Sequence, residues 1–309
     1  MTRVAAVDCG TNSIRLLIAD AVGDGDQIDL IDLDRRMLIV RLGQGVDATG
    51  RLAPEALERT FGAARGYADA IAAAGAEKVR VVATSATRDA ENRDEFAAGM
   101  TEIFGVAPEV VPGDVEARLS FVGATAGLDA GGIAGPYLVV DIGGGSTEFV
   151  LGTTAPTAAR SVDVGCVRML ERYLHDDPPA KEQVAAAAAA IDEAIAAAAA
   201  VVPLAQARSL IGVAGTVTTL TAIALDLPEY DAAKVHLARI PAERIREVAD
   251  RLLSSSREQR ATIGALHPKR VDVIAAGALI LERVLATLGD PDLVASEHDI
   301  LDGIARSLL

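Results

Sequence analysis

Residues 137–150 read Tyr-Leu-Val-Val-Asp-Ile-Gly-Gly-Gly-Ser-Thr-Glu-Phe-Val, and this stretch decides how the rest of the chain is interpreted. An apolar run ends at Asp141, a turn of glycines and small polar residues follows, and a second apolar run leaves through Phe149. Glycine permits positive φ and a close approach of backbone to ligand. The pattern therefore predicts a strand, a tight turn and a returning strand.

The turn of this predicted hairpin has the composition of an anion-binding site. Successive backbone N–H groups in such a turn form a concavity that binds anions. The candidate phosphate-binding residues are Gly143, Gly144, Gly145, Ser146 and Thr147. Asp141 and Glu148 flank the turn, and carboxylates beside a phosphate indicate a divalent cation between them. An ordinary Gly-rich hairpin that faces water is the alternative left open by this stretch alone.

The same polar spacing occurs a second time, near the N-terminus. Residues 3–20 form an apolar run that ends at Asp8, a small turn and an apolar return, so Asp-x-Gly-x-x-Ser appears at 8–13 and at 141–146. The first copy adds Asp8, Gly10, Thr11, Asn12 and Ser13 as candidate phosphate-binding residues. The repeat predicts two similar domains, each with a phosphate-binding hairpin. We place them at 1–124 and 125–298, with a closing helix 299–309 that is free to pack back on the first.

Composition narrows the class of protein. The chain has 309 residues, 50% of them hydrophobic, which suits about two globular domains. A net charge of −15 disfavours a nucleic-acid binder. No uncharged apolar run approaches the roughly 18 residues of a membrane span, and the N-terminus lacks the pattern of a signal peptide. Two cysteines fit a reducing compartment. We expect a cytoplasmic protein that binds neither nucleic acid nor membrane.

Other polar residues lie where a ligand site is expected. The predicted strand 79–83 delivers Arg88 to its carboxyl end, where ligands gather in α/β sheets. Arg88 is either a phosphate clamp or a solvated surface arginine. Glu116 lies in the first turn of a predicted helix and either complements the helix dipole or acts in catalysis. Gly215 and Thr216 follow a third strand and open a helix, an arrangement that favours anions.

Five short motifs occur along the chain in a fixed order. They are Asp8-Cys-Gly-Thr-Asn-Ser13, Ala83-Thr-Ser-Ala-Thr-Arg88, Gly113-x-x-Glu-Ala-Arg-Leu119, Val140-Asp-Ile-Gly-Gly-Gly-Ser-Thr-Glu148 and Gly212-Val-Ala-Gly-Thr216. Together they resemble the exopolyphosphatase / guanosine pentaphosphate phosphohydrolase family, within the actin-like superfamily of sugar kinases, Hsp70 and actin. The resemblance implies an α/β fold of two actin-like (ribonuclease H-like) domains, each a mixed sheet flanked by helices, with an interdomain cleft.

The resemblance also implies a role for individual residues. Glu116 matches the family's catalytic glutamate, which is proposed to activate the attacking water. Asp141 and Glu148 match carboxylates that hold Mg²⁺, or another divalent cation, or that position water. Gly10 to Ser13 and Gly143 to Ser146 match two phosphate-binding hairpins, and Arg88 matches an arginine that grips substrate phosphate.

The function expected from this resemblance is Mg²⁺-dependent exopolyphosphatase activity, which releases orthophosphate from the end of inorganic polyphosphate. Longer family members carry an extra C-terminal helical domain, so we expect short polyphosphate chains as substrate here. Three alternatives stay open: a guanosine pentaphosphate 5′-phosphohydrolase, which needs a guanine pocket near residues 212–216, a superfamily kinase, and a non-catalytic phosphate sensor. Helices rich in small apolar residues suit a homodimer interface and equally an ordinary core.

Overall fold

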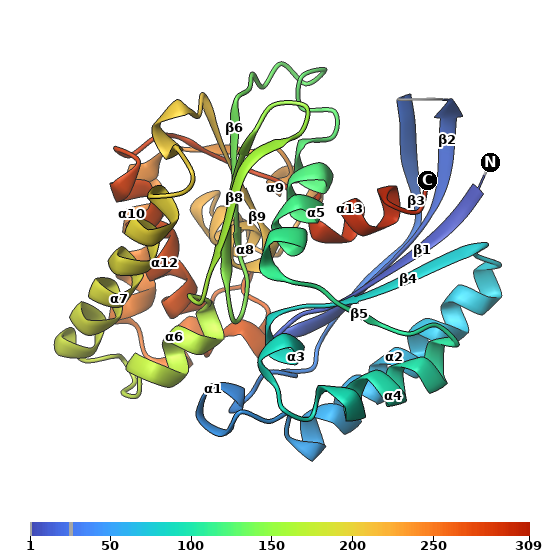
Figure 1. Cartoon of the computed structure of the whole chain (residues 1–309). Coiled ribbons are helices and arrows are strands. Elements are labelled where there is room, and N and C mark those ends of the chain that lie inside the picture. Colours follow the sequence, from blue (N-terminus) through green and yellow to red (C-terminus); the bar gives the residue numbers. More distant parts are fainter. Residues whose placement is uncertain (1, 25–26) are drawn as a thin grey trace. The chain divides into compact units, whose positions relative to one another are not determined.

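The computed structural model describes residues 2–24 and 27–309 and divides the chain into two compact units. Unit 1 comprises Met1–Gly123 together with Ile300–Leu309, and unit 2 comprises Ala124–Asp299. Each unit is built on one mixed sheet, with five strands in unit 1 and six in unit 2 among the described residues. Helices flank both sheets (Figure 1). The α/β fold class predicted from the sequence is confirmed.

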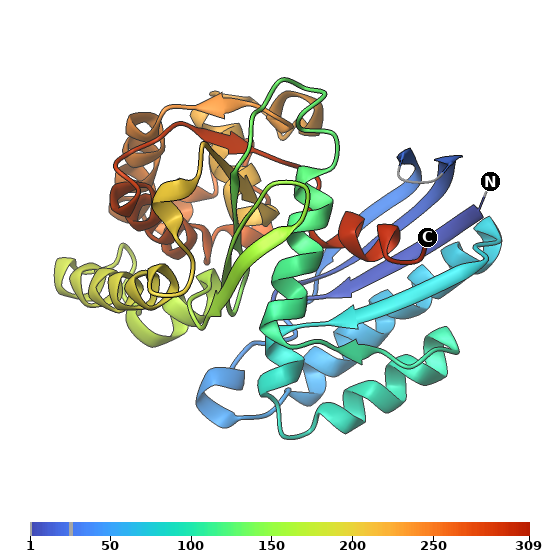
Figure 2. The same cartoon turned by 45° about the horizontal axis from the view of Figure 1, so that its top comes forward.

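The sheet of unit 1 has the strand order β3-β2-β1-β4-β5. Its strands are β1 (Thr2–Cys9), β2 (Ser13–Asp24), β3 (Gln27–Ile39), β4 (Lys78–Ala83) and β5 (Glu109–Val110). β1 is antiparallel to β2 and parallel to β4. Helices α2 (Pro54–Ala74) and α4 (Arg93–Phe104) cover one face, and α13 (Ile300–Arg306) packs on the other (Figure 2). Because both faces of the sheet are covered, residues 4–7 in the middle of β1 are all apolar and buried.

The sheet of unit 2 repeats this arrangement and has the order β10-β11-β9-β6-β7-β8. Its strands are β6 (Tyr137–Ile142), β7 (Thr147–Gly152), β8 (Pro156–Val162), β9 (Ser209–Val213), β10 (Arg239–Ile240) and β11 (Leu293–Ala295). β6 is antiparallel to β7 and parallel to β9, as β1 is to β2 and β4. Both predicted hairpins are therefore present, each at the first strand of its sheet. Helices α7 (Lys181–Ala199), α10 (Ala242–Ser254) and α12 (Ile274–Thr287) pack together beside this sheet (Figure 1).

The remaining helical elements are α1 (Val46–Thr49), α3 (Ser85–Asp89), α5 (Gly113–Thr125), α6 (Cys166–Tyr173), α8 (Ala214–Ala224), α9 (Ala232–Val235), α11 (Arg257–Arg260), and the 3₁₀ turns Leu204–Gln206 and Pro268–Arg270. They include α3, α5 and α8, which carry candidate site residues. None of the helices within the described ranges is both long enough and apolar enough to span a membrane.

Candidate active site residues in each unit

The turn of the first hairpin is held in place by the loop that follows β3. The Gly10 N–H donates to the Ser13 carbonyl at 2.9 Å and closes the turn. Gly43 N–H donates to the Thr11 carbonyl at 2.8 Å, and Arg41 N–H donates to the Asn12 carbonyl at 2.9 Å. A Cβ on Gly43 would lie 2.4 Å from the Thr11 methyl carbon, so only glycine fits this contact. The turn is thus fixed by backbone contacts.

Asp8 and Asn12 place buried polar groups at this turn. Asp8 Oδ2 accepts hydrogen bonds from Arg15 Nη2 at 2.7 Å and Nε at 2.9 Å, across the register that pairs the two residues. The Asn12 side chain is buried, and its amide nitrogen and oxygen have no hydrogen-bond partner among the described residues. Buried amides in folded proteins are nearly always hydrogen-bonded to protein or to ordered water, so the Asn12 amide is available to a group outside the chain.

Arg88 and Glu116 meet directly, although 28 residues separate them in the sequence. Arg88 lies on α3, directly after β4, and its Nη1 donates to Glu116 Oε2 at 3.0 Å and to the Val111 carbonyl at 3.0 Å. Glu116 lies in the first turn of α5 and is only 8% exposed. Two anchors on one guanidinium fix the orientation of both side chains. The structure therefore brings together Arg88 and Glu116, the two residues for which the local sequence left both a functional and an ordinary structural role open.

The second hairpin places two carboxylates opposite each other. Asp141 on β6 and Glu148 on β7 are direct cross-strand partners, and both are buried. Ser161 Oγ on β8 donates to Glu148 Oε1 at 2.7 Å. Like charges on directly opposite residues are unfavourable, so a cation bound between them would relieve the repulsion.

Helix α6 sets the orientation of the turn between these strands. Cys166 N–H donates to the Gly143 carbonyl at 3.0 Å, Val167 N–H to the Gly144 carbonyl at 2.9 Å, and Arg168 Nε to the Gly145 carbonyl at 2.8 Å. In a planar trans peptide the N–H points opposite to the C=O. The N–H groups of residues 144–146 are consequently directed away from α6, as an anion site requires.

The strand-to-helix turn at Gly215 and Thr216, where α8 begins, makes a contact with Arg270 that the sequence did not indicate. A Cβ on Gly215 would lie 2.0 Å from Arg270 Nη2, so the guanidinium rests against the first turn of α8. Ala214 there has φ 68°, a left-handed conformation that costs free energy for a non-glycine residue. A cation and a helix N-terminus repel each other, yet both attract anions. Thr216 is buried beside Gly277.

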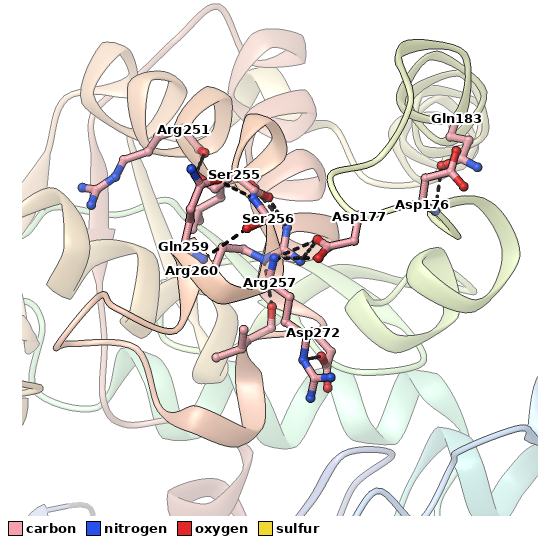
Figure 3. Close-up of polar contacts among 12 residues, drawn as sticks. Asp176, Asp177, Gln183, Arg251, Ser255, Ser256, Arg257, Gln259, Arg260 and Asp272 are labelled. Atoms are coloured by element: carbon pink, nitrogen blue, oxygen red, sulfur yellow. Dashed lines mark hydrogen bonds and ion pairs between the residues drawn. The ribbon is translucent and has the colours of Figure 1, made fainter.

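The segment that bears Arg270 is held by a buried arginine. Arg260 Nε donates to the Val271 carbonyl at 3.1 Å, and its Nη2 pairs with Asp177 at 3.0 Å. Arg257 Nε adds an ion pair with Asp272 at 2.7 Å (Figure 3). Figure 3 shows Arg260 and Asp177 pointing toward each other from different segments. Arg270 thus belongs to a well-anchored part of unit 2.

Comparison with known proteins places the chain in a family. Residues 18–309 match the model of the Ppx/GppA phosphatase family, and the chain belongs to this family. Its sequence is 50% identical to Exopolyphosphatase 2 of Mycobacterium tuberculosis, over 100% of this chain and 99% of that protein.

Solved structures agree with the family. The crystal structure of an exopolyphosphatase-like protein matches with a TM-score of 0.95 and 46% identity, covering 99% of this chain and 97% of the other. The structure of the Aquifex aeolicus PPX-GPPA enzyme matches with a TM-score of 0.81 and 30% identity, covering 99% of both chains.

Among the residues that contact candidate site residues and that sequence reasoning missed are Arg15, Ser161 and Arg270. The contact of Arg15 was predictable from the sequence, because counting residues along a tight hairpin places Arg15 opposite Asp8. Ser161 comes from the next strand, and its pairing depends on a bulge near residue 152. Arg270 lies 55 positions beyond Gly215 and has no local signal.

Proposed function

We propose that this protein is an exopolyphosphatase that hydrolyses the terminal phosphoanhydride of inorganic polyphosphate, preferably short chains, and releases orthophosphate. The observation that carries the proposal is the hydrogen bond between Arg88 and Glu116, which holds a carboxylate beside a guanidinium of the kind that binds phosphate. The 50% identity to a relative named Exopolyphosphatase 2 over the whole chain supports this choice of substrate.

Each unit supplies different groups to the proposed reaction. In unit 1, Glu116 accepts the proton of the attacking water, and Arg88 binds the phosphate under attack. In unit 2, the N–H groups of the Gly143–Ser146 turn and the guanidinium of Arg270 bind phosphate oxygens. Phosphoryl transfer is accelerated mainly by positioning and charge stabilisation, which fixed groups of this kind supply.

Asp141 and Glu148 are the residues that would hold Mg²⁺ in this proposal. Among the described residues there is no cluster of three or more His, Cys, Asp or Glu side chains that suits a metal ion. Mg²⁺ is commonly bound by one or two carboxylates together with substrate phosphates, and the Asp141–Glu148 pair fits that donor set. When bound, Mg²⁺ neutralises charge on the phosphate oxygens.

One assay tests the proposed function. The protein is incubated with Mg²⁺ and, separately, with tripolyphosphate, long polyphosphate, guanosine pentaphosphate and ATP, and released orthophosphate is measured. The proposal predicts release from tripolyphosphate at the highest kcat/KM. Release from guanosine pentaphosphate alone would establish the phosphohydrolase alternative, and no release from any substrate would favour a phosphate sensor.

We further propose that the protein is cytoplasmic and forms a homodimer. β3 lies at the edge of its sheet and exposes Ile31 and Leu33, a surface that a second copy would cover. Light scattering coupled to gel filtration measures the mass directly, and a monomer at micromolar concentration would contradict this part.

A further inference from the structure

Ser85 carries a hydroxyl group without a partner in the described structure. The residue is the first of α3 and is only 2% exposed, and its Oγ makes no hydrogen bond within residues 2–24 and 27–309. The buried hydroxyl of Thr60, also in unit 1, does find a partner in the Ala56 carbonyl at 2.7 Å. Because burial without a hydrogen bond is unfavourable, a hydroxyl left in this state is a candidate for ligand binding where it also lies beside a predicted binding turn.

The sheet of unit 1 places Ser85 beside the first hairpin turn. β4 runs parallel to β1 with Ala83 opposite Cys9, so Ser85 and the turn at 10–12 leave the same edge of the sheet. Thr84 N–H donates to the Cys9 carbonyl at 3.2 Å and carries this pairing one residue further. On the other side of the turn, the Cβ position of Gly43 lies 3.0 Å from the Ala86 methyl group.

Ser85 also shares a helix face with Arg88. Residues three apart on a helix lie on the same side, so Ser85 lies one turn before the arginine that binds Glu116. Across the same sheet edge, both polar atoms of the buried Asn12 amide lack a partner among the described residues. Unit 1 thus has three groups at this edge of its sheet that can bind a phosphate: the Ser85 hydroxyl, the Asn12 amide and the Arg88 guanidinium.

We propose that Ser85 is a substrate-binding residue whose hydroxyl donates a hydrogen bond to a non-bridging oxygen of the same phosphate that Arg88 binds. The Asn12 amide supplies a second neutral donor to that phosphate. The choice of polyphosphate as ligand rests on the proposed function. A binding role of this kind predicts a larger effect on KM than on kcat, because the contact exists in the ground state as well as in the transition state.

The decisive variant is Ser85→Ala. Its KM for tripolyphosphate should rise about 10–100-fold, the equivalent of one hydrogen bond to a charged group, with kcat within about threefold of wild type. The melting temperature of the ligand-free protein should stay equal or increase, since the variant removes a hydroxyl with no protein partner. A decrease would show that the hydroxyl has a protein partner and would overturn the inference.

Thr87→Val is the matched control. Thr87 Oγ1 is equally buried and without a partner among the described residues, but it lies two positions from Ser85 and so on a different side of α3. Its KM should match wild type. An equal rise in both variants would mean that α3 is simply perturbed, and an unchanged KM in Ser85→Ala would equally refute the role.

Binding without turnover separates this inference from the proposed function. Calorimetric titration of tripolyphosphate into Glu116→Gln, with and without Ser85→Ala, should show the same 10–100-fold loss of affinity. If wild type releases orthophosphate but Ser85→Ala leaves affinity unchanged, only the inference fails. If wild type hydrolyses no polyphosphate, the proposed function itself fails.

Discussion

Glu116 is hydrogen-bonded to Arg88, and its proposed role as the base that activates water can be tested by a substitution that changes one atom of its carboxylate. Glu116→Gln keeps the shape and can still contact Arg88, but it cannot accept the proton of water. We predict that kcat falls by roughly 10²–10⁴-fold, the usual contribution of a general base, with KM changed by less than about threefold. The rate of orthophosphate release at saturating tripolyphosphate measures kcat, and its dependence on tripolyphosphate concentration measures KM.

Glu109→Gln is the control for this variant. Glu109 is an exposed carboxylate of unit 1 that pairs with Arg80, so its loss changes the net charge equally without touching the site. It should retain wild-type activity. If Glu116→Gln is as active as Glu109→Gln, Glu116 does not activate water.

His267 gives a prediction about pH. The His267 side chain is exposed, but partial loss of hydration lowers its pKa, and the nearby Arg270 and Lys269 lower it further. His267 Nδ1 accepts a hydrogen bond from Lys269 N–H at 3.1 Å, which protonation would remove. The unfolded chain therefore takes up a proton first, and stability present above about pH 6.5 is lost as the pH falls through the folded pKa.

His267→Asn tests this prediction, because asparagine offers a similar acceptor that does not titrate. Melting temperatures at pH 7.5, 6.5 and 5.5 should fall more steeply for wild type than for the variant. Parallel curves for the two proteins would rule out His267 as a source of the pH dependence.

At the scale of elements, the contact between α6 and the second hairpin depends on a single glycine. Gly165 has an ordinary extended backbone, but a Cβ there would lie 2.4 Å from the carbonyl carbon and oxygen of Gly144. Gly165→Ala must therefore push the turn away from α6. We predict a loss of about 1–3 kcal/mol in the free energy of unfolding and a loss of activity, from urea denaturation and phosphate release.

Gly62→Ala provides the matched control for Gly165→Ala. Gly62 lies within α2, with nothing within 4 Å of its Cβ position. Alanine there should stabilise the protein by about 0.5–1 kcal/mol, because it is the better helix former. If Gly165→Ala behaves like Gly62→Ala, the α6 contact does not hold the turn.

The two hairpins were predictable because their signals are local: apolar runs on either side of a turn rich in glycine and small polar residues. The expected roles of Gly143 to Ser146 likewise came from the turn sequence. The helix at Ser85–Asp89 was not predicted, since five residues after a strand carry too little periodicity. Arg270 against Gly215 was not predictable either, because packing of distant segments brings the two together.

At the scale of the whole molecule, the two sheets with equivalent hairpins follow from the Asp-x-Gly-x-x-Ser repeat. The repeat predicts that each hairpin exists and that both bind phosphate. The repeat does not identify the residue that activates water, because Glu116 lies outside the Asp-x-Gly-x-x-Ser pattern. The catalytic role expected for Glu116 came from the resemblance to a family. The contact of Glu116 with Arg88 became visible only once α3 and α5 were folded.

Metal dependence is also a property of the whole protein. Because the candidate ligands are two carboxylates and the substrate, Mg²⁺ alone should shift the melting temperature of Glu116→Gln little, and Mg²⁺ with tripolyphosphate should raise it clearly. EDTA should abolish orthophosphate release by wild type, and excess Mg²⁺ should restore it. Full activity in EDTA would contradict a role of Asp141 and Glu148 in metal binding.

The central claim is that water attacks the terminal phosphorus of a polyphosphate chain. The most direct test is hydrolysis of tripolyphosphate in ¹⁸O-labelled water, with the products resolved by ³¹P NMR. The proposed reaction predicts one ¹⁸O atom in the released orthophosphate and none in the pyrophosphate product. Label in the pyrophosphate, or no orthophosphate at all, would contradict it.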